Sequence, residues 1–225
     1  MERYVRLEEI SDGRLYGPND MVRADCGGCE GCPASCCRGM GNTIVLDPLD
    51  VFRMTTALGA KFEELLIDKI ELNVADGLIL PNLKMDGEGE SCVFLNSQGR
   101  CSIHDARPGI CRLFPLGRYY ENRSFQYFLQ TNECRKENRS KIKVKKWIDT
   151  PELEKYQKFI TDWHYFLKDI QEMLQKMEDE ARRKEISMYI LTSFYVIGYQ
   201  GDEDFYQQVQ QRMNQGTGRV GMGTL

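Results

Sequence analysis

Apolar positions follow two different periods along this chain. Between residues 78 and 134 they come in short continuous or alternating runs, which are typical of β-strands. After residue 150 they recur every three or four positions, which is typical of an amphipathic helix. The pattern therefore predicts an α+β fold in which a helical extension follows a part of mixed structure.

Two helices are predicted ahead of the strand-like region. Asp47 is suited to cap a helix that begins at Pro48, and Gly59 is suited to end it after Leu58. A second helix is expected over residues 60–72, because four apolar residues share one helical face there. These four residues are Phe62, Leu65, Leu66 and Ile70.

Several short strands are also predicted. Residues 43–46 form an apolar run that is long enough for one strand. Residues 92–95 and 100–103 flank a polar turn, so we expect a β-hairpin. Residues 118–120 and 124–128 flank a second polar turn and predict another hairpin.

The last third of the chain predicts helices joined by turns. An apolar stripe at helical spacing runs from Leu153 to Met177. Since neither Gly nor Pro interrupts the chain again before Gly198, we expect a turn near residues 178–184 and hence a helical hairpin. A last helix is predicted over residues 202–213, followed by a glycine-rich tail.

Cysteine content and charge narrow the function. The chain has nine cysteines and a net charge of −4, which gives no electrostatic case for binding nucleic acid or a membrane. Its start does not resemble a signal peptide, and no run reaches the roughly 18–20 apolar residues of a membrane span. We therefore expect a cytoplasmic protein, in which clustered thiols hold metal rather than form disulfides.

Eight of the nine cysteines are candidate metal ligands, and they fall into two sets. The first set has the spacing C-x2-C-x2-C-x3-C-C and comprises Cys26, Cys29, Cys32, Cys36 and Cys37. The second set comprises Cys92, Cys101 and Cys111. Three thiols do not complete a four-ligand site, so we expect both sets to share one centre or two close ones.

Two further expectations concern single cysteines. In the adjacent pair Cys36–Cys37, the side chains are not expected to reach one tetrahedral ion together, so one would ligate while the other packs or is redox-active. Cys134 falls outside both sets and is expected to be a buried free thiol.

The spacing favours an iron–sulfur cluster, with zinc as the alternative cofactor. The first four cysteines match the C-x2-C-x2-C-x3-C run of ferredoxin-type 4Fe–4S sites. Zinc sites usually combine two C-x2–4-C knuckles, and the second set has none. Arg38 and Arg112 adjoin candidate ligands and either offset thiolate charge or are ordinary surface arginines. His104 is expected to form a hydrogen bond, with a role as a further ligand as the alternative.

A series of motifs resembles a known family. In order along the chain they are Cys29-x2-Cys32-x3-Cys36-Cys37, Ile44-Val45-Leu46-Asp47-Pro48-x-Asp50, Cys92-x-Phe94-Leu95, Gly99-x-Cys101-x-Ile103-His104, and Arg107-Pro108-x2-Cys111-Arg112-x-Phe114-Pro115. Together they resemble the YkgJ-type cysteine cluster family, whose members are described as zinc- or iron-chelating or as containing an Fe–S cluster. The resemblance covers about residues 26–134. It is distantly similar to the cysteine cluster of flagellin lysine N-methylases, although no region reads as a methyltransferase domain.

These observations predict the organisation of the chain. A polar lead-in over residues 1–25 precedes a cysteine-cluster metal-binding domain over residues 26–147, a small core with short β-hairpins and two helices. A helical extension over residues 148–214 and a flexible tail over residues 215–225 follow. Within the metal-binding domain, the basic stretch from Arg135 to Lys146 is expected to be an edge strand protected by lysines, or a patch for an anionic partner.

The favoured function is a metal-binding protein that holds an iron–sulfur cluster, or zinc, through cysteine thiolates and has a redox or metal-handling role. One alternative is a modifying enzyme related to protein lysine methylases. Another is a zinc-stabilised interaction module whose C-terminal helices bind a protein partner.

Overall fold

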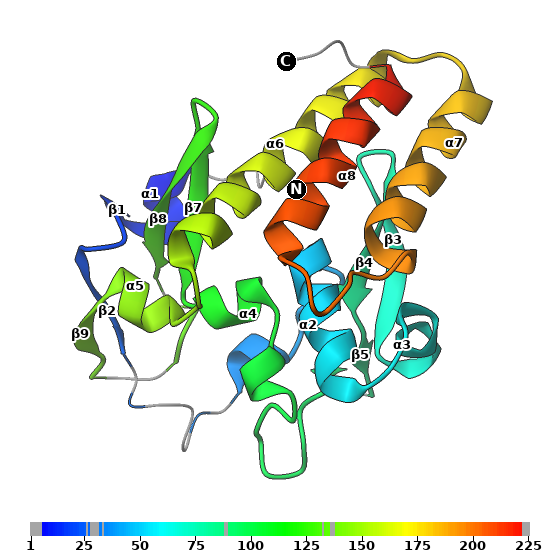
Figure 1. Cartoon of the computed structure of the whole chain (residues 1–225). Helices are drawn as coiled ribbons and strands as arrows, with labels where there is room; N and C mark the ends of the chain where they lie inside the picture. Colours follow the sequence, from blue (N-terminus) through cyan, green and yellow to red (C-terminus); the bar gives the residue numbers. More distant parts are fainter. Residues whose placement is uncertain are drawn as a thin grey trace. The chain divides into compact units, whose positions relative to one another are not determined.

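The computed structural model combines helices and strands, in agreement with the predicted α+β class (Figure 1). It describes residues 6–25, 27, 32, 34–87, 90–131, 133–135 and 138–221. The chain divides into two compact units, each assembled from two stretches of sequence. The helical unit comprises Val45–Lys84 and Glu154–Leu225, and the cysteine unit comprises Glu2–Ile44 and Met85–Leu153. The range 26–147, predicted as one domain, therefore contributes to both units.

The first helix of the helical unit, α2 (Pro48–Leu58), begins and ends where the sequence predicts. The carboxylate of Asp47 accepts a hydrogen bond from the backbone N–H of Asp50 at 2.9 Å, and the carboxylate of Asp50 accepts one from the N–H of Asp47 at 3.1 Å. This reciprocal pair satisfies two backbone donors at the helix start. Gly59 has a φ of 62° and ends the helix in the left-handed conformation.

The next helix is shorter than predicted. Helix α3 (Phe62–Asp68) does not continue to residue 72, because strand β3 (Ile70–Ala75) begins directly after it. Strand β3 pairs antiparallel with β4 (Leu78–Leu83) across the two-residue turn Asp76–Gly77, in which both φ angles are positive. This turn type suits the twist of a β-hairpin and favours the Asp-Gly sequence. Residues 43–46, predicted to be a strand, form only a single β-bridge, between Val45 and Asn82.

The C-terminal helices follow the predicted apolar stripe. In chain order the elements are α6 (Leu153–Lys176), α7 (Glu180–Leu191), the π-helical turn η3 (Thr192–Val196) and α8 (Phe205–Val220). The break after α6 falls at the predicted place. Helix α8 runs further than predicted, to Val220, and thus occupies part of the range 215–225 that was expected to be a tail. Residues 222–225 of that range lie outside the described residues.

Aromatic side chains fill the core of the helical unit. The ring of Phe194, in η3, is fully buried and lies 4.8 Å from the ring of Trp163 and 5.4 Å from that of Phe166, measured between centroids. The neighbouring Tyr195 donates a hydrogen bond from its hydroxyl to the backbone oxygen of Leu46 at 3.0 Å. The π-helical turn thus directs two successive aromatic residues into the core.

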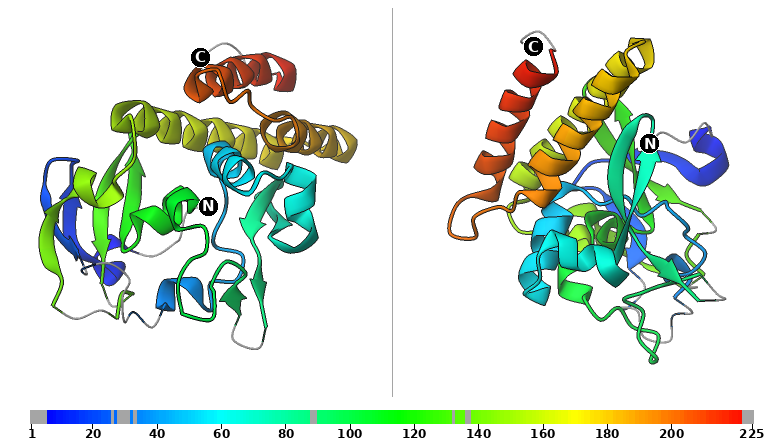
Figure 2. Two further views of the ribbon diagram at one scale, coloured as in Figure 1. Left: turned by 60° about the horizontal axis from the view of Figure 1, so that its bottom comes forward. Right: turned by 90° about the vertical axis from the view of Figure 1, so that its right-hand side faces the viewer.

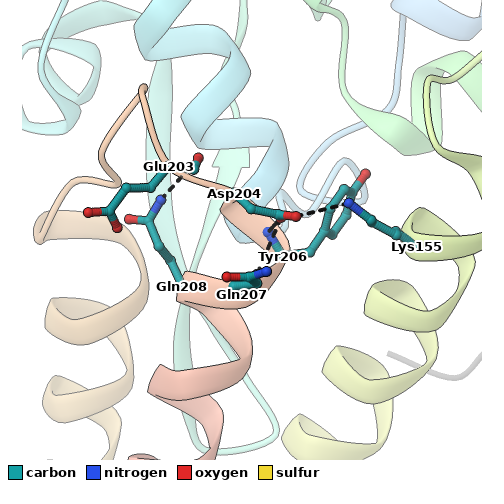
Figure 3. A network of polar contacts seen from close by, with 6 residues as sticks. All are labelled: Lys155, Glu203, Asp204, Tyr206, Gln207 and Gln208. Carbon is teal, nitrogen blue, oxygen red and sulfur yellow. Dashed lines mark hydrogen bonds and ion pairs between the residues drawn. The ribbon is translucent and has the colours of Figure 1, made fainter.

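A polar network fixes the start of α8 (Figure 3). The carboxylate of Asp204 accepts hydrogen bonds from the backbone N–H groups of Tyr206 and Gln207, and Lys155 on α6 donates to it at 2.9 Å. The hydrogen bond from Lys155 is the main cause that lowers the pKa of Asp204. Asp204 therefore caps α8 and also connects it to α6.

The described residues of the cysteine unit form three small antiparallel sheets (Figure 1 and Figure 2). The three-stranded sheet has the order β1 (Ser11–Tyr16), β8 (Ser124–Gln130), β7 (Leu116–Glu121). The second sheet pairs β2 (Met21–Asp25) with β9 (Ser140–Lys143). The third sheet pairs β5 (Met85–Asp86) with β6 (Ser91–Cys92). Strands β1 and β2 lie in the range 1–25, which was predicted as a polar lead-in. Strands β7 and β8 are joined at Asn122–Arg123, both with positive φ.

Short helices complete the cysteine unit. They are α1 (Leu7–Ile10), α4 (Gly109–Leu113) and α5 (Val144–Ile148). The indole N–H of Trp147 on α5 donates to the backbone oxygen of Leu113 at 3.2 Å, which joins α5 to α4. Of the stretch 141–147, the first residues belong to β9, where Lys141 and Lys143 are exposed, and the rest to α5.

Gly117 on β7 makes a close backbone contact that another residue would disturb. A Cβ atom at this position would lie 2.3 Å from Cζ of Phe128, the buried residue opposite it on β8. We expect Gly117→Ala to lower the free energy of unfolding by about 1–3 kcal/mol, because the ring must move within a packed core. Urea unfolding measures this. Gly198→Ala is the control, since a Cβ there meets nothing within 4 Å, and equal effects of the two variants would contradict the prediction.

Candidate metal centre

The first cysteine set is described in part. Cys26 and Cys29 lie outside the described residues. Cys32 is half-buried, and Cys36 and Cys37 lie in the 3-10 turn η1 (Ser35–Cys37). Ala34 precedes this turn with a φ of 55°, and its backbone oxygen accepts a hydrogen bond from the N–H of Cys37 at 2.9 Å. The chain thus reverses direction just before the adjacent cysteines.

In the second set, the predicted hairpin is reduced to one antiparallel bridge around a tight loop. Cys92 is buried at the end of β6, and Cys101 forms a single β-bridge with Leu95. Residues 92–95 and 100–103 are therefore not a pair of strands. The side-chain oxygen of Asn96 accepts hydrogen bonds from the N–H groups of Gln98 and Arg100, at 3.0 and 2.9 Å, and this organises a tight loop instead.

Cys111 comes from a third local element. It lies half-buried in the short helix α4, whose start at Gly109 follows Pro108. The backbone oxygen of Pro108 accepts a hydrogen bond from the N–H of Arg112 at 2.9 Å. Pro108 therefore caps the start of the helix that carries Cys111.

The backbone brings the two cysteine sets side by side. Arg38 forms a β-bridge with Ser91, and the N–H of Gly39 donates to the backbone oxygen of Glu90 at 3.0 Å. The guanidinium of Arg38 also donates to the hydroxyl of Ser91 at 2.6 Å. Because Arg38 directly follows Cys37 and Ser91 directly precedes Cys92, these bonds join the two stretches at the cysteines themselves.

The adjacent thiols of Cys36 and Cys37 form a hydrogen-bonded pair. Their sulfurs are 3.8 Å apart. The hydrogen bond from Cys37 is the main cause that lowers the pKa of Cys36, to about 7. The same bond is the main cause that raises the pKa of Cys37, and burial and the charge of Cys36 add to it. The pair therefore holds one proton between two sulfurs and readily carries one negative charge.

The other thiols act on this pair and on one another. The charges of Cys111 and Cys92 raise the pKa of Cys37 further. Burial is the main cause that raises the pKa of Cys92, and the charges of Cys101 and Cys36 add to it. Five of the eight predicted ligands are thus close enough to affect each other's ionisation. They come from both sets.

The separation within the adjacent pair has a consequence for ligation. Zn–S bonds of about 2.3 Å at tetrahedral angles place two sulfurs about 3.8 Å apart. The distance between the sulfurs of Cys36 and Cys37 has this value, so the pair is compatible with two ligands on one ion, and whether one or both of them ligate stays a prediction. Among the described residues, however, no three Cys, His, Asp or Glu side chains are grouped closely enough to hold an ion as they stand. A complete set of ligands therefore remains a proposal.

The remaining residues singled out by sequence have other contacts. The Nε2 atom of His104 contacts Nη1 of Arg107, which agrees with the expected hydrogen-bonding role. Arg112 donates to the backbone oxygens of Asp105 and Asp149. Cys134 is half-buried rather than buried, and like each described cysteine it is a free thiol.

One comparison with known proteins bears on this site. Residues 28–146 match the CxxCxxCC family, described as a domain proposed to chelate zinc or iron. The chain belongs to this family. The CxxCxxCC match includes seven of the eight predicted ligands and begins just after Cys26. Membership of this family supports metal binding by the protein.

No curated protein and no solved structure is significantly similar to this CxxCxxCC protein. Within the stretches that the structure describes, no helix is both long enough and apolar enough to cross a membrane.

Proposed function

We propose that this protein binds a zinc- or iron-containing centre through the thiolates of its CxxCxxCC domain and has a redox or metal-handling role. The observation that carries the proposal is the position of the Cys36–Cys37 pair, whose next residue, Arg38, is bridged to the neighbour of Cys92. Thiolates are the ligands that both zinc and iron–sulfur clusters prefer. These cysteine thiolates thus fit the zinc or iron chelation that the family description names.

The proposed ligands are the eight cysteines of the two sets: Cys26, Cys29, Cys32, Cys36, Cys37, Cys92, Cys101 and Cys111. We place Cys36 and Cys37 first among them, followed by the thiols that act on this pair. Cys36 supplies a thiolate near neutral pH, whereas Cys37 must release its proton when metal binds. When bound, the metal would supply either folding energy or one-electron chemistry. The protein's part is to hold the sulfurs together and to exchange that proton.

The geometry of the pair bears on which metal is bound. The asymmetry between the two cysteine sets favours iron–sulfur over zinc. In a 4Fe–4S cluster each iron takes one protein thiolate, whereas zinc, or one iron of a 2Fe–2S cluster, takes two. Two sulfurs 3.8 Å apart suit two ligands on a single metal atom. We therefore favour a 2Fe–2S cluster over a 4Fe–4S cluster, with a single zinc ion as the alternative.

Anaerobic purification followed by metal and sulfide analysis tests this proposal. The iron form predicts about two irons and about two acid-labile sulfides per chain, with visible absorption that dithionite bleaches. The zinc form predicts about one zinc per chain, no sulfide and no colour. A folded protein that carries neither metal, and takes up neither during anaerobic reconstitution, would contradict the proposal.

The two alternative functions have less support. A modifying enzyme that uses S-adenosylmethionine needs a cavity of the size typical for small-molecule sites, about 300 Å³ or more. Among the described residues, those between α6 and α8 line a pocket of about 80 Å³, and this pocket is too small for that cosubstrate. A zinc-stabilised interaction module remains compatible with the zinc form, and it predicts that the C-terminal helices bind a protein partner irrespective of the metal's redox activity.

A further inference from the structure

We propose that the exposed face of the β2–β9 sheet, together with α5, binds an acidic segment of a partner protein. This inference goes beyond the proposed function, because it concerns a surface of the cysteine unit and does not depend on whether metal is bound. Five exposed cations carry it, and we call them the basic patch. They are Arg23 on β2, Lys141 and Lys143 on β9, and Lys145 and Lys146 on α5.

Strand pairing places three of these cations on one face of the sheet. Strands β2 and β9 are antiparallel, and Met21 lies opposite Lys143. The next residue of β2, Val22, is only 1% exposed, so the face to which it points is covered, and Met21 and Lys143 point to the other face. Alternation along each strand adds Arg23 and Lys141 to this second face, and both are exposed.

Helix α5 adds two lysines beside this sheet (Figure 1). It follows β9 directly, and the backbone N–H of Val144 donates to the backbone oxygen of Asp20, just before β2, at 3.0 Å. The side chain of Val144 is buried, whereas Lys145 and Lys146 are exposed. The positive charges therefore come from three elements that adjoin one another within one unit.

The basic patch is not neutralised by its surroundings. Among the described residues, no acidic side chain forms an ion pair with any of the five cations. The carboxylates at the two ends of β2 have other partners: Asp20 accepts a hydrogen bond from the N–H of Gly17 at 2.7 Å, and Asp25 accepts one from the hydroxyl of Ser140 at 3.1 Å. Positive charge is thus concentrated locally on a chain whose net charge is −4. Such a surface attracts and orients a partner of opposite charge.

Protection of sheet edges explains only part of this charge. Both strands of a two-stranded sheet are edges, and cations on an edge prevent it from pairing with another chain. Arg23, Lys141 and Lys143 suit that role. Lys145 and Lys146 do not, because they lie on a helix, which has no strand edge to protect. Their presence beside the sheet favours a binding surface.

The other side chains of β2, β9 and α5 favour a protein partner over a nucleic acid or a membrane. Proteins that bind single-stranded nucleic acid stack the bases on exposed aromatic rings. The aromatic residue of these elements, Trp147, is half-buried and donates its indole N–H to Leu113. Membrane insertion requires several exposed apolar side chains, whereas Met21, 48% exposed, is the one large apolar residue that these described elements expose. A methionine among cations suits a protein interface, where methionine is enriched.

The test measures the binding of a fluorescein-labelled deca-glutamate peptide to the full chain by fluorescence anisotropy. We expect saturable binding at about 20 mM salt and an affinity at least about fivefold lower at about 200 mM salt, because the Debye length falls below about 10 Å. Lys141→Gln/Lys143→Gln and Lys145→Gln/Lys146→Gln should each weaken binding about three- to tenfold, as expected for the loss of two exposed charge pairs. Circular dichroism checks that the variants are folded.

Lys176→Gln/Lys184→Gln is the matched control. It removes the same charge from two exposed positions in the helical unit, at the end of α6 and in α7. Because these lysines lie outside the basic patch, the control should change the affinity for the peptide by less than about 1.5-fold.

Three outcomes would overturn the inference. The first is that the wild-type chain shows no saturable binding of the peptide at low salt, and the second is that the control weakens binding as much as the patch variants do. The third is that a single-stranded RNA decamer, or vesicles of anionic lipid, bind the patch more than about tenfold more tightly than the peptide. If one patch variant fails to fold, the other decides. None of these outcomes bears on metal binding, so the proposed function is tested separately.

Discussion

Replacing Cys37 with serine is expected to lower metal affinity by at least about 100-fold. A structural zinc site yields about 10–16 kcal/mol from four ligands, so the loss of one thiolate removes roughly a quarter of that energy. Cys37 suits this test because its sulfur lies 3.8 Å from that of Cys36. The charges of Cys92 and Cys111 also raise its pKa, so it lies near thiols of both sets. Competition with a chromophoric chelator under anaerobic conditions measures the change.

Cys134→Ser is the matched control for this variant. Cys134 is also a half-buried free thiol, but it lies outside both cysteine sets. It should keep metal affinity within about threefold of the wild type, since no ligand is lost. If Cys134→Ser removed the metal while Cys37→Ser retained it, the assignment of ligands would be wrong even though metal binding itself would stand.

Truncation of Phe194 to alanine is expected to lower the free energy of unfolding by about 3–5 kcal/mol. Its side chain is fully buried between the rings of Trp163 and Phe166, so the variant leaves a cavity that these two rings cannot close. Urea unfolding followed by tryptophan fluorescence measures the change, because Trp163 is in contact with the altered site.

Ile197→Ala is the control for the core variant. Ile197 directly follows the same π-helical turn, but 54% of its surface is exposed. Its truncation should change the free energy of unfolding by no more than about 0.5 kcal/mol. Similar losses from both variants would mean that η3 is not packed as described.

Local signals predicted some elements of the fold well. Helix α2 was predicted to the residue because its start and stop depend on side chains next to it in sequence: Asp47, Pro48 and Gly59. The stripe of α6 and the break before α7 were also predicted, since an amphipathic helix of that length repeats its pattern many times. These features needed no information about distant parts of the chain.

Other elements were missed for identifiable reasons. The first three residues of β3, 70–72, were assigned to a helix because Leu66 and Ile70 have helical spacing, although Asp76–Gly77 is a strong hairpin signal that sequence analysis overlooked. The hairpin expected around Cys92 and Cys101 ignored the ability of the Asn96 side chain to organise a loop. Helix α8 continues through Gly216 and Gly218, where helix propensity alone favours an end.

The candidate site was predicted as a set of residues but not as a geometry. Spacing identified the cysteines and suggested that both sets meet. It did not show that the sulfurs of Cys36 and Cys37 lie 3.8 Å apart, because this depends on the conformation of the turn that follows Ala34.

The division of the chain into interleaved units implies an order of assembly during synthesis. Every cysteine, and the whole of the cysteine unit, has left the ribosome's peptidyl-transferase centre once residue 153 is added. Residues 45–84 cannot complete their unit until Glu154–Leu225, its other stretch, has been synthesised. The sequence of the cysteine unit is therefore complete while the helical unit still lacks its second stretch. A product released early at residue 153 would carry the thiols, but its 45–84 segment would have no helices against which to bury Leu46, Met54 and Leu65.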